Sequence, residues 1–262
     1  MAAISFPLML ALLSTQAPMA ANAEGDYTRA AGASIGPGIC DPGMDMLPNG
    51  GGVVIRRCGK NGTVAGVGSN IDAATANTNG FLAVAEEGPV CSVFARDPYV
   101  SLRAPGVGIK AQCSSTPLSA YGMTTTTAGQ NVLELAINLA ATQAWCNVDY
   151  YYGSAHGYKY PYTCNRPGQS WSVAGLGSSV DDSNAMAMRL VKKSSKTGTH
   201  CYFDNAELNG VVFRAYLHCN GSTYTGFGSS VTAAAKDGRK AALFQVENEN
   251  RSRFVALPID QG

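Results

Sequence analysis

The stretch Cys164–Val191 reads CNRPGQSWSVAGLGSSVDDSNAMAMRLV, and related copies of it occur at three other places in the chain. The copies begin at Cys58 (CGKNGTVAGVGSNIDAATANTNGFLAV), at Cys219 (CNGSTYTGFGSSVTAAAKDGRKAALFQV) and, in a more divergent form, at Cys113 (CSSTPLSAYGMTTTTAGQNVLELAINL). Each copy combines a short strand-like run, a glycine-rich turn and a helical pattern. Such self-similarity indicates one supersecondary unit used several times.

We therefore expect an α+β fold made of four tandem, disulfide-bridged hairpin-strand-helix repeats of about 50–55 residues, with antiparallel sheets and one helix per repeat. The expected divisions are a signal peptide (1–23), a lead-in (24–39) and repeats over 40–90, 91–145, 146–200 and 201–262. An alternative division is two double-repeat domains split near 153–157. The helix near Thr127–Ala144 carries only one charge, so it is expected to be the most buried.

The two ends of the predicted row suggest how the repeats are arranged. The stretch after Cys40 (DPGMDMLPNGG) is too rich in proline and glycine for a regular strand, whereas Val53–Cys58 is a good strand. The chain also has a last strand-like run at Phe254–Leu257. Pairing that run with Val53–Cys58 would remove an exposed edge and join the last repeat to the first in a closed arrangement. The alternative is an open arrangement in which the two terminal strands do not pair.

The N-terminus has the pattern of an export signal. An apolar run, Ile4–Leu13, is followed by small residues and by Ala21-Asn22-Ala23, which matches an A-x-A cleavage site, although no lysine or arginine precedes the run. The run is too short to span a bilayer, and no later segment is long enough to do so. We expect cleavage after Ala23 and a secreted or periplasmic protein without a transmembrane segment.

Charge and cysteine content narrow the function classes. The formal net charge is +1, which gives no electrostatic case for binding nucleic acid. The chain contains 8 cysteines, and an even number in an exported chain is typical of a disulfide framework. No Walker, dinucleotide or H-E-x-x-H pattern is present, so no cofactor or metal is expected.

The repeat makes the cysteine pairing arguable. The pairs Cys40–Cys58, Cys146–Cys164 and Cys201–Cys219 are each 18 positions apart and Cys91–Cys113 is 22 apart, and each encloses two strand-like runs around a turn. A rival scheme pairs cysteines across the helices, as Cys58–Cys91, Cys113–Cys146 and Cys164–Cys201. The last repeat has Arg251 where that scheme needs a cysteine. The hairpin scheme is therefore favoured.

Strand alternation predicts that the cysteine side of each hairpin faces the core, because Ile109, Ala111, Phe203, Val211 and Leu217 share that side. In the tyrosine-rich hairpin before Cys164 the same parity directs most tyrosines inward. These are Tyr150, Tyr152, Tyr158, Tyr160 and Tyr162, while Tyr151, Asp149 and Lys159 are expected to face solvent. The tyrosines are thus interpreted as core rather than as a sugar-stacking platform.

The glycine-serine turns before the helices have two interpretations. A strand, a glycine-rich turn and a helix start can hold an anion on free backbone N–H groups. The simpler interpretation is a turn followed by a serine cap, since Ser69-x-x-Asp72 and Ser178-x-x-Asp181 match a capping box. An aspartate at that position would also repel phosphate, so we favour the structural role.

The best polar constellation lies in the last hairpin. His200 and His218 each precede a cysteine of one predicted bridge, and the outward face also carries Tyr202, Asp204, Arg214 and Tyr216. The weak catalytic candidates are His200, His218 and Asp204, and the binding candidates are Tyr202, Arg214, Tyr216 and His218. A solvated sheet face without a catalytic role is the simpler interpretation, because no nucleophile with positioned partners is evident.

Three functions remain open from the sequence. The first is a binding or inhibitory module for a protein or glycan outside the cytoplasm. The second is an extracellular hydrolase that uses His200, His218 and Asp204, and the third is a structural envelope or surface component. Asn61, Asn220 and Asn250 stand in glycosylation sequons, which would matter in a eukaryotic host.

Overall fold

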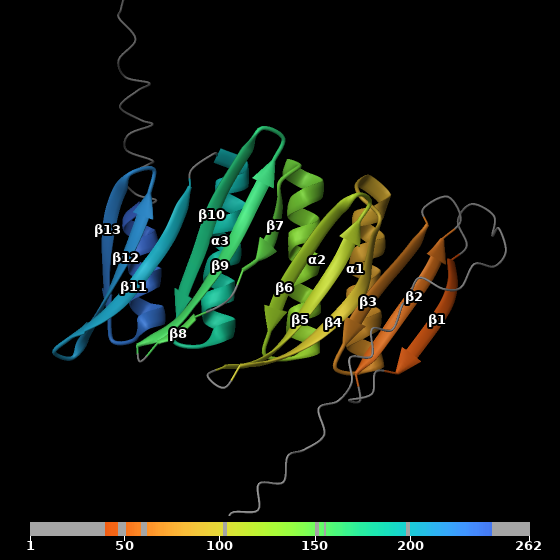
Figure 1. The fold of residues 1–262 in the computed structure, drawn as a ribbon, viewed down its shortest axis with the longest axis horizontal. Helices are drawn as coiled ribbons and strands as arrows, with labels where there is room; N and C mark the ends of the chain where they lie inside the picture. Colours follow the sequence, from red (N-terminus) through yellow and green to blue (C-terminus); the bar gives the residue numbers. More distant parts are fainter. Residues whose placement is uncertain are drawn as a thin grey trace, which may run out of the picture.

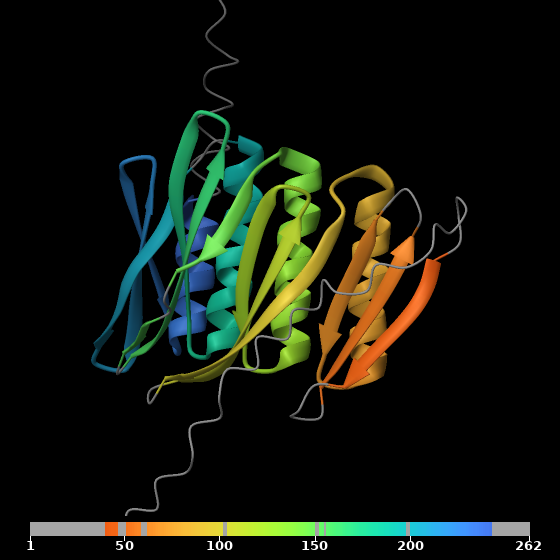
Figure 2. The same ribbon diagram turned by 45° about the vertical axis from the view of Figure 1, so that its right-hand side comes forward.

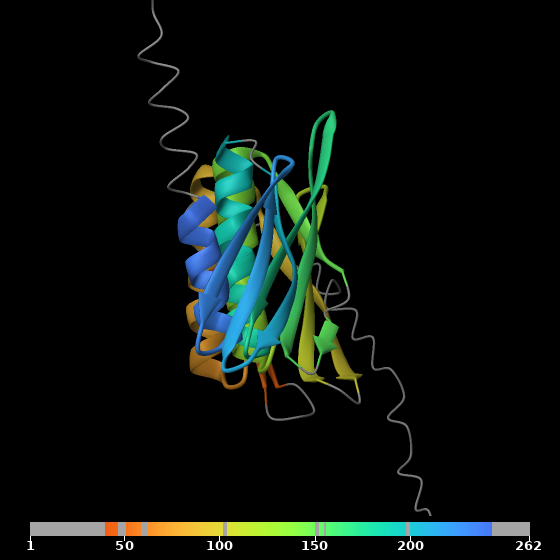
Figure 3. The same ribbon diagram turned by 90° about the vertical axis from the view of Figure 1, so that its left-hand side faces the viewer.

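The described part of the protein is a two-layer structure in which one twisted sheet carries all the described helices on the same face (Figures 1 and 3). This computed structural model describes residues 40–46, 51–58, 62–101, 104–149, 152–154, 156–197 and 200–242. The sheet has 13 strands in the order β1-β2-β3-β4-β5-β6-β7-β9-β10-β11-β12-β13, and β8 pairs with β9 beside this path. The fold is therefore α+β, as the sequence predicts.

The described elements fall into four successive groups, each with a hairpin, a third strand and a helix. Group 1 contains β1 (Cys40–Met46), β2 (Gly52–Cys58), β3 (Thr63–Gly68) and α1 (Ile71–Glu87). Group 2 contains β4 (Cys91–Ser101), β5 (Ala104–Cys113), β6 (Thr116–Gly122) and α2 (Thr125–Thr142). Group 3 contains β7 (Trp145–Val148), β8 (Tyr152–Ser154), β9 (Gly157–Arg166), β10 (Gln169–Gly177) and α3 (Val180–Thr197). Group 4 contains β11 (Cys201–Asn209), β12 (Val212–Cys219), β13 (Ser222–Gly228) and a last helix over 231–242.

The groups are joined by parallel strand pairs, which the sequence analysis did not foresee. Within each group the strands pair antiparallel, but β3 pairs parallel with β4, β6 with β7 and β10 with β11. Each parallel pair is connected through a helix, as parallel strands require. One sheet therefore runs through all four groups, and strands on both sides of 153–157 belong to it.

The expected closure of the row is wrong. Strands β1 and β13 lie at opposite ends of the sheet, as Figure 2 also shows. The reason is that β2, the proposed partner of the C-terminal strand, pairs with β1 on one side and with β3 on the other. A strand has only two edges, so none remains for Phe254–Leu257, which lies outside the described residues.

The expectation that the stretch after Cys40 is too irregular for a strand is also wrong. Its residues form β1, which pairs with β2 without interruption from Cys40 opposite Cys58 to Met46 opposite Gly52. The strand lies at the edge of the sheet, the position where proline is tolerated because one row of N–H groups has no ladder partner. Edge position therefore explains how Pro42 fits.

The hairpin pairing of the cysteines is confirmed for three bridges, Cys91–Cys113, Cys146–Cys164 and Cys201–Cys219. Cys58 is also disulfide-bonded, and the register of β1 and β2 places it opposite Cys40. The rival pairing across the helices is wrong. Disulfides of this kind are compatible with an oxidising compartment outside the cytoplasm.

The cysteine side of the hairpins faces the helices, as predicted. Ile109, Ala111, Phe203 and Leu217 are fully buried together with the bridged cysteines. Val211 is the exception, because it lies in the turn beyond the helix layer and is 89% exposed. The prediction that Val211 faces the core is therefore wrong.

The tyrosine-rich hairpin also packs largely as predicted. Tyr160 and Tyr162 are fully buried, Tyr158 is half-buried and Asp149 is exposed. Lys159 is only half-buried, because it forms an ion pair with Asp204 at 3.6 Å. Tyr150 and Tyr151 lie outside the described residues, as does the side chain of Tyr152. The buried tyrosines are core residues and not an exposed stacking platform.

Helix α3, rather than α2, is the most buried of the three helices α1, α2 and α3. It buries ten of its residues and α2 buries seven. The low charge of α2 was therefore a poor guide, since Ile137 of this helix is 48% exposed. Helix α3 lies close to its strand because Gly175 has no side chain there. A Cβ on Gly175 would stand 2.0 Å from the carbonyl oxygen of Ser183.

The helices begin one residue later than the proposed capping boxes imply. Asn70, not Ser69, caps α1 by accepting from Ala73 N, and Ser179, not Ser178, accepts from Asp182 N at the start of α3. The preceding serines have another role. Their backbone N–H groups donate to the next helix, from Ser69 to Thr126 Oγ1 at 2.9 Å and from Ser178 to Thr232 Oγ1 at 2.8 Å. These bonds tie neighbouring groups together.

Candidate functional site

The face of the sheet opposite the helices is not covered by any described element, and its last hairpin carries a patch of aromatic and charged side chains. We call this the outer patch. Its members are Tyr202, Glu207, Arg214, Tyr216, His218, Thr223 and Phe227. They share a face because strand residues two apart point the same way, and because the register of β11, β12 and β13 places them in rows.

One row of the outer patch runs from Tyr202 through His218 to Thr223. The rings of Tyr202 and His218 stack with their centroids 5.1 Å apart and their planes 25° apart. His218 Nδ1 lies 3.0 Å from Thr223 Oγ1. This hydrogen bond and the stacking fix the imidazole, while Tyr202 remains 42% exposed and available to a partner.

A second row runs from Glu207 through Arg214 to Phe227. The guanidinium of Arg214 lies 5.7 Å from the centre of the Phe227 ring, and Phe227 is 50% exposed. The Tyr216 hydroxyl donates to Glu207 Oε2 at 2.8 Å, and this bond to a carboxylate raises the pKa of Tyr216. The row therefore presents an aromatic face, a cation and an anion close together.

The structure brings the binding candidates together, whereas the catalytic candidates have separate partners. His200 stacks on the ring of Trp171 at 5.4 Å, His218 stacks on Tyr202, and Asp204 pairs with Lys159. A register shift between Phe203 and Ala206 puts Asp204 in a bulge. In the described chain no hydrogen bond or ion pair joins any two of His200, His218 and Asp204, so the hydrolase remains a prediction without a shared geometry.

The glycine-serine turns before α1 and α3 do not offer the N–H groups of Ser69 and Ser178 to an anion. The N–H groups of Ser69 and Ser178 are already bonded to the following helices. Within the described ranges no cluster of three histidine, cysteine, aspartate or glutamate side chains is placed to hold a metal ion. None of the described helices is long and apolar enough to cross a membrane.

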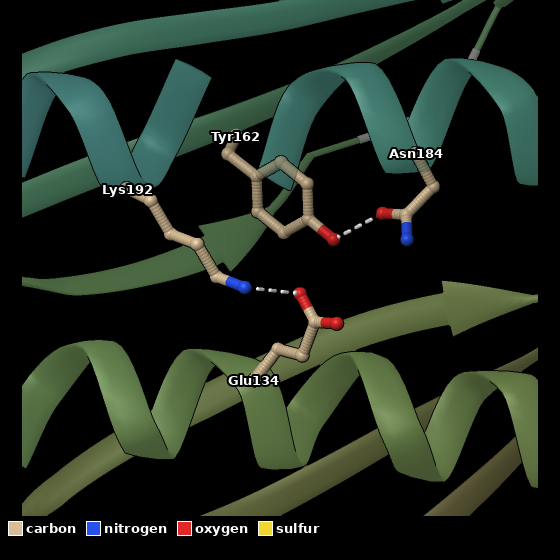
Figure 4. Close-up of polar contacts among 4 residues, drawn as sticks. All are labelled: Glu134, Tyr162, Asn184 and Lys192. Carbon is tan, nitrogen blue, oxygen red and sulfur yellow. Dashed lines mark hydrogen bonds and ion pairs between the residues drawn. The ribbon is translucent and has the colours of Figure 1, made fainter. Parts of the chain in front are cut away.

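A second feature, which the sequence analysis missed, is a polar groove between α2 and α3. It encloses about 340 Å³. It is lined by Thr127, Gln130, Asn131, Glu134, Asp181, Asn184, Ala185, Met188, Arg189 and Lys192. Figure 4 shows two contacts there, an ion pair of 3.0 Å between Lys192 and Glu134 and a hydrogen bond of 2.6 Å from the Tyr162 hydroxyl to Asn184 Oδ1.

The buried part of the groove depends on Tyr162 and Asn184, which are almost completely inaccessible to solvent. Burial raises the pKa of Tyr162, so the phenol stays protonated and keeps donating to Asn184. The helical pattern of α3 hides this site in the sequence, because Asn184 is one polar residue among many. Its partner Tyr162 is a strand residue 22 positions earlier.

Comparison with known proteins adds little to this geometry. No protein-family model matches the chain. A probable periplasmic serine endoprotease DegP-like of Brucella suis is 59% identical over 32 residues, which is 12% of this chain and 6% of that protein. The corresponding protein of Rhizobium meliloti is 62% identical over 32 residues, again 12% and 6% of the two chains. Such short matches define no family and carry no function.

Proposed function

We propose that the protein is an exported, disulfide-stabilised repeat protein that acts as a binding or inhibitory module for a protein or glycan partner outside the cytoplasm. In this proposal the four groups are copies of one hairpin-strand-helix unit over 40–90, 91–145, 146–200 and 201–262. The module contacts its partner through the outer patch and the hairpin ends beside it.

The observation that carries the proposal is the exposure of Tyr202 and Phe227 on a sheet face that no described element covers. Aromatic side chains and arginine contribute most to binding energy at protein interfaces, and aromatic rings present large area at low entropic cost. The outer patch combines both kinds of group with Glu207 and His218. It therefore offers stacking, cationic and hydrogen-bonding contacts on one surface.

The support beneath the patch favours recognition of a partner of fixed shape. The Cys201–Cys219 bridge joins the two strands that carry Tyr202 and His218, on the opposite side of the hairpin. Fully buried Phe203 and Leu217 hold the same strands on the helix layer. A rigid, preorganised surface loses less conformational entropy on binding than a mobile loop.

The test is capture of partners from the extracellular or periplasmic fluid of the source, together with a glycan array, for the native protein and for Tyr202→Ala and Phe227→Ala. We expect the native protein to retain a partner and each variant to lose about tenfold or more in affinity, the usual effect of truncating an interface aromatic.

Ile137→Ala is the matched control, since Ile137 is 48% exposed on the helix layer and lies outside the patch. This variant is expected to bind like the native protein. The proposal is wrong if the captured partner binds all three variants equally, because binding would then use another surface.

A further inference from the structure

The two ends of the sheet are complementary, and the three internal junctions between groups show how they fit. At each junction the third strand of one group pairs parallel with the first strand of the next. The paired residues are Ala65 with Ser92, Ser119 with Asn147 and Ala174 with Tyr202. In every case the second residue directly follows a cysteine. The junctions therefore share one register.

The same register identifies the unmatched positions at the two ends. On its other side the third strand of each group pairs with the second strand of the hairpin. There Ala65 lies opposite Ile55, Ser119 opposite Lys110 and Ala174 opposite Pro161. Each of these partners stands three residues before the second cysteine of its hairpin. In β13 this place belongs to Thr225, which lies opposite Tyr216. In β1 the residue after the cysteine is Asp41. Both strands are seven residues long and form the outer strands of the described sheet.

A hydrogen bond between helix and turn repeats at the same junctions. The residue before each N-cap donates its backbone N–H to the second residue of the next helix. The bonds join Ser69 to Thr126, Met123 to Asp181 and Ser178 to Thr232. At the C-terminal end the corresponding donor is Ser229, for which the described residues supply no acceptor. At the N-terminal end the corresponding acceptor is Asp72, which is exposed and has no donor within the described ranges.

The helices at the two ends also carry opposite charge. Helix α1 contains three acidic residues, Asp72, Glu86 and Glu87, and no basic residue. The last helix, over 231–242, contains Lys236, Arg239 and Lys240 with only one acid, Asp237. Copies placed end to end would set the basic helix against the acidic one. Charge complementarity of this kind directs association and selects the partner.

We infer that the β13 edge of one molecule binds the β1 edge of a second copy, in parallel, with Thr225 opposite Asp41 and the N–H of Ser229 bonded to Asp72. The contact reproduces the internal junctions between different molecules. It is heterologous, since different surfaces of the two copies meet, so assembly continues one copy at a time into a ring or a filament. Within the described sheet the outer edges of β1 and β13 have no paired strand, and such edges are templates for strand addition.

This assembly goes beyond the proposed binding function and uses the hydrogen-bonding edges of β1 and β13 rather than the sheet face, although β13 also carries Thr223 and Phe227 of the outer patch. It can be tested by sedimentation velocity of the purified, oxidised protein over a wide range of concentrations. We expect species that grow by single copies as concentration rises. Asp72→Lys removes the acceptor for Ser229 and opposes the basic helix, so it should raise the dissociation constant by about tenfold or more. The loss of an acid from the first turn of α1 should lower the melting temperature only slightly.

Asp181→Ala is the matched control, because Asp181 holds the same helix position at an internal junction. This variant also loses an acid from the first turn of a helix, but it should leave association unchanged, in contrast to Asp72→Lys. The register is tested by mixing Asp41→Cys and Thr225→Cys molecules. A short thiol cross-linker should join the two variants to each other far more than it joins either to itself.

Two results would overturn the inference. A single, monomeric mass at all concentrations would mean that the edges are covered within one chain, for example by its own terminal residues. A species that stops at two copies and is insensitive to Asp72→Lys would indicate an isologous contact between identical edges. Either outcome leaves the outer patch, and the function proposed for it, unaffected.

Discussion

Two of the interfaces between neighbouring helices, here called the α1–α2 seam and the α2–α3 seam, differ although the groups beside them share the same order of elements. In the seam between α1 and α2 a Cβ on Gly80 would stand 2.3 Å from Leu133 Cδ2, and one on Gly129 would stand 2.7 Å from Asn77 Nδ2. At Gly129 the Val67 carbonyl oxygen, 2.8 Å from that Cβ, leaves no space for a side chain. The seam between α2 and α3 instead contains a groove of about 340 Å³ lined mostly by polar side chains.

One helix position accounts for much of this difference. Gly129 is the fifth residue of α2, and Asn184 is the fifth residue of α3. The glycine lets the helices touch, whereas the asparagine lines the groove and needs a hydrogen-bond partner, which Tyr162 supplies. The residue at one equivalent helix position thus differs between the two interfaces, with a glycine where the helices are in close contact and an asparagine where a polar groove lies between them.

The largest loss of stability is expected from adding a side chain to the close-packed α1–α2 seam. Gly129→Val would place two methyl groups where a single Cβ already meets Asn77 and the Val67 carbonyl, so we expect a loss of about 3 kcal/mol in the free energy of unfolding. Urea unfolding of the oxidised protein measures it. Gln130→Val, at the next and exposed position, is the control and should change stability by no more than about 0.5 kcal/mol. Equal stability of the two variants would contradict the account of this seam.

In the α2–α3 seam, substitutions of Tyr162 and Asn184 should have coupled effects on stability. Tyr162→Phe leaves the amide of Asn184 without its partner and should cost about 1–3 kcal/mol, and Asn184→Leu should cost a similar amount because it leaves the buried hydroxyl unpaired. The double variant should be closer to the native protein than the two losses added together. Strict additivity in urea unfolding would show that the bond does not couple the two residues.

Alkaline pH should lower the free energy of unfolding through the buried Tyr162 beside the α2–α3 groove. Burial raises the pKa of Tyr162 above its ordinary value of 10.0, so above pH 10 the unfolded chain loses a proton that the folded chain keeps. Stability is therefore fully present below pH 10 and falls as pH rises, by about 1.4 kcal/mol per pH unit for each such tyrosine. Burial also raises the pKa of Tyr160, so Tyr162→Phe should reduce this slope without abolishing it. An unchanged slope would exclude Tyr162 as a cause.

The smallest effect is expected at the rim of the groove. Lys192 and Glu134 are paired at 3.0 Å, but their side chains are 49% and 44% exposed. Lys192→Met should therefore cost less than about 1 kcal/mol, and the difference from the native protein should shrink in high salt. A salt-independent loss of several kcal/mol would mean that the pair is structurally central to the seam.

Much of the fold could be predicted because its signals are local. The 18- and 22-residue cysteine spacings identified the bridged hairpins, and strand parity identified buried residues such as Phe203 and Tyr162. The parallel pairing between groups could not be read from these signals, because it depends on how successive groups stack. The exposure of Val211 was missed for a similar reason, since parity does not say where the helix layer ends.

The candidate site was predicted in part. The outward face of the last hairpin, with Tyr202, Arg214, Tyr216 and His218, follows from alternation alone. The position of Asp204 does not, because the bulge that displaces it has no clear sequence signal. The groove was missed altogether, since it arises from side chains on two helices that are brought together only by the sheet beneath them.

The placement of the three described bridges has a mechanical consequence. Each closes a loop within a single hairpin, and none of them crosses a junction between groups. A molecule pulled from its two ends would therefore lengthen in separate steps as junctions part, while the residues between bridged cysteines add no length. The cystines set an upper limit on extension and preserve the local pairings from which the sheet can re-form when tension is released.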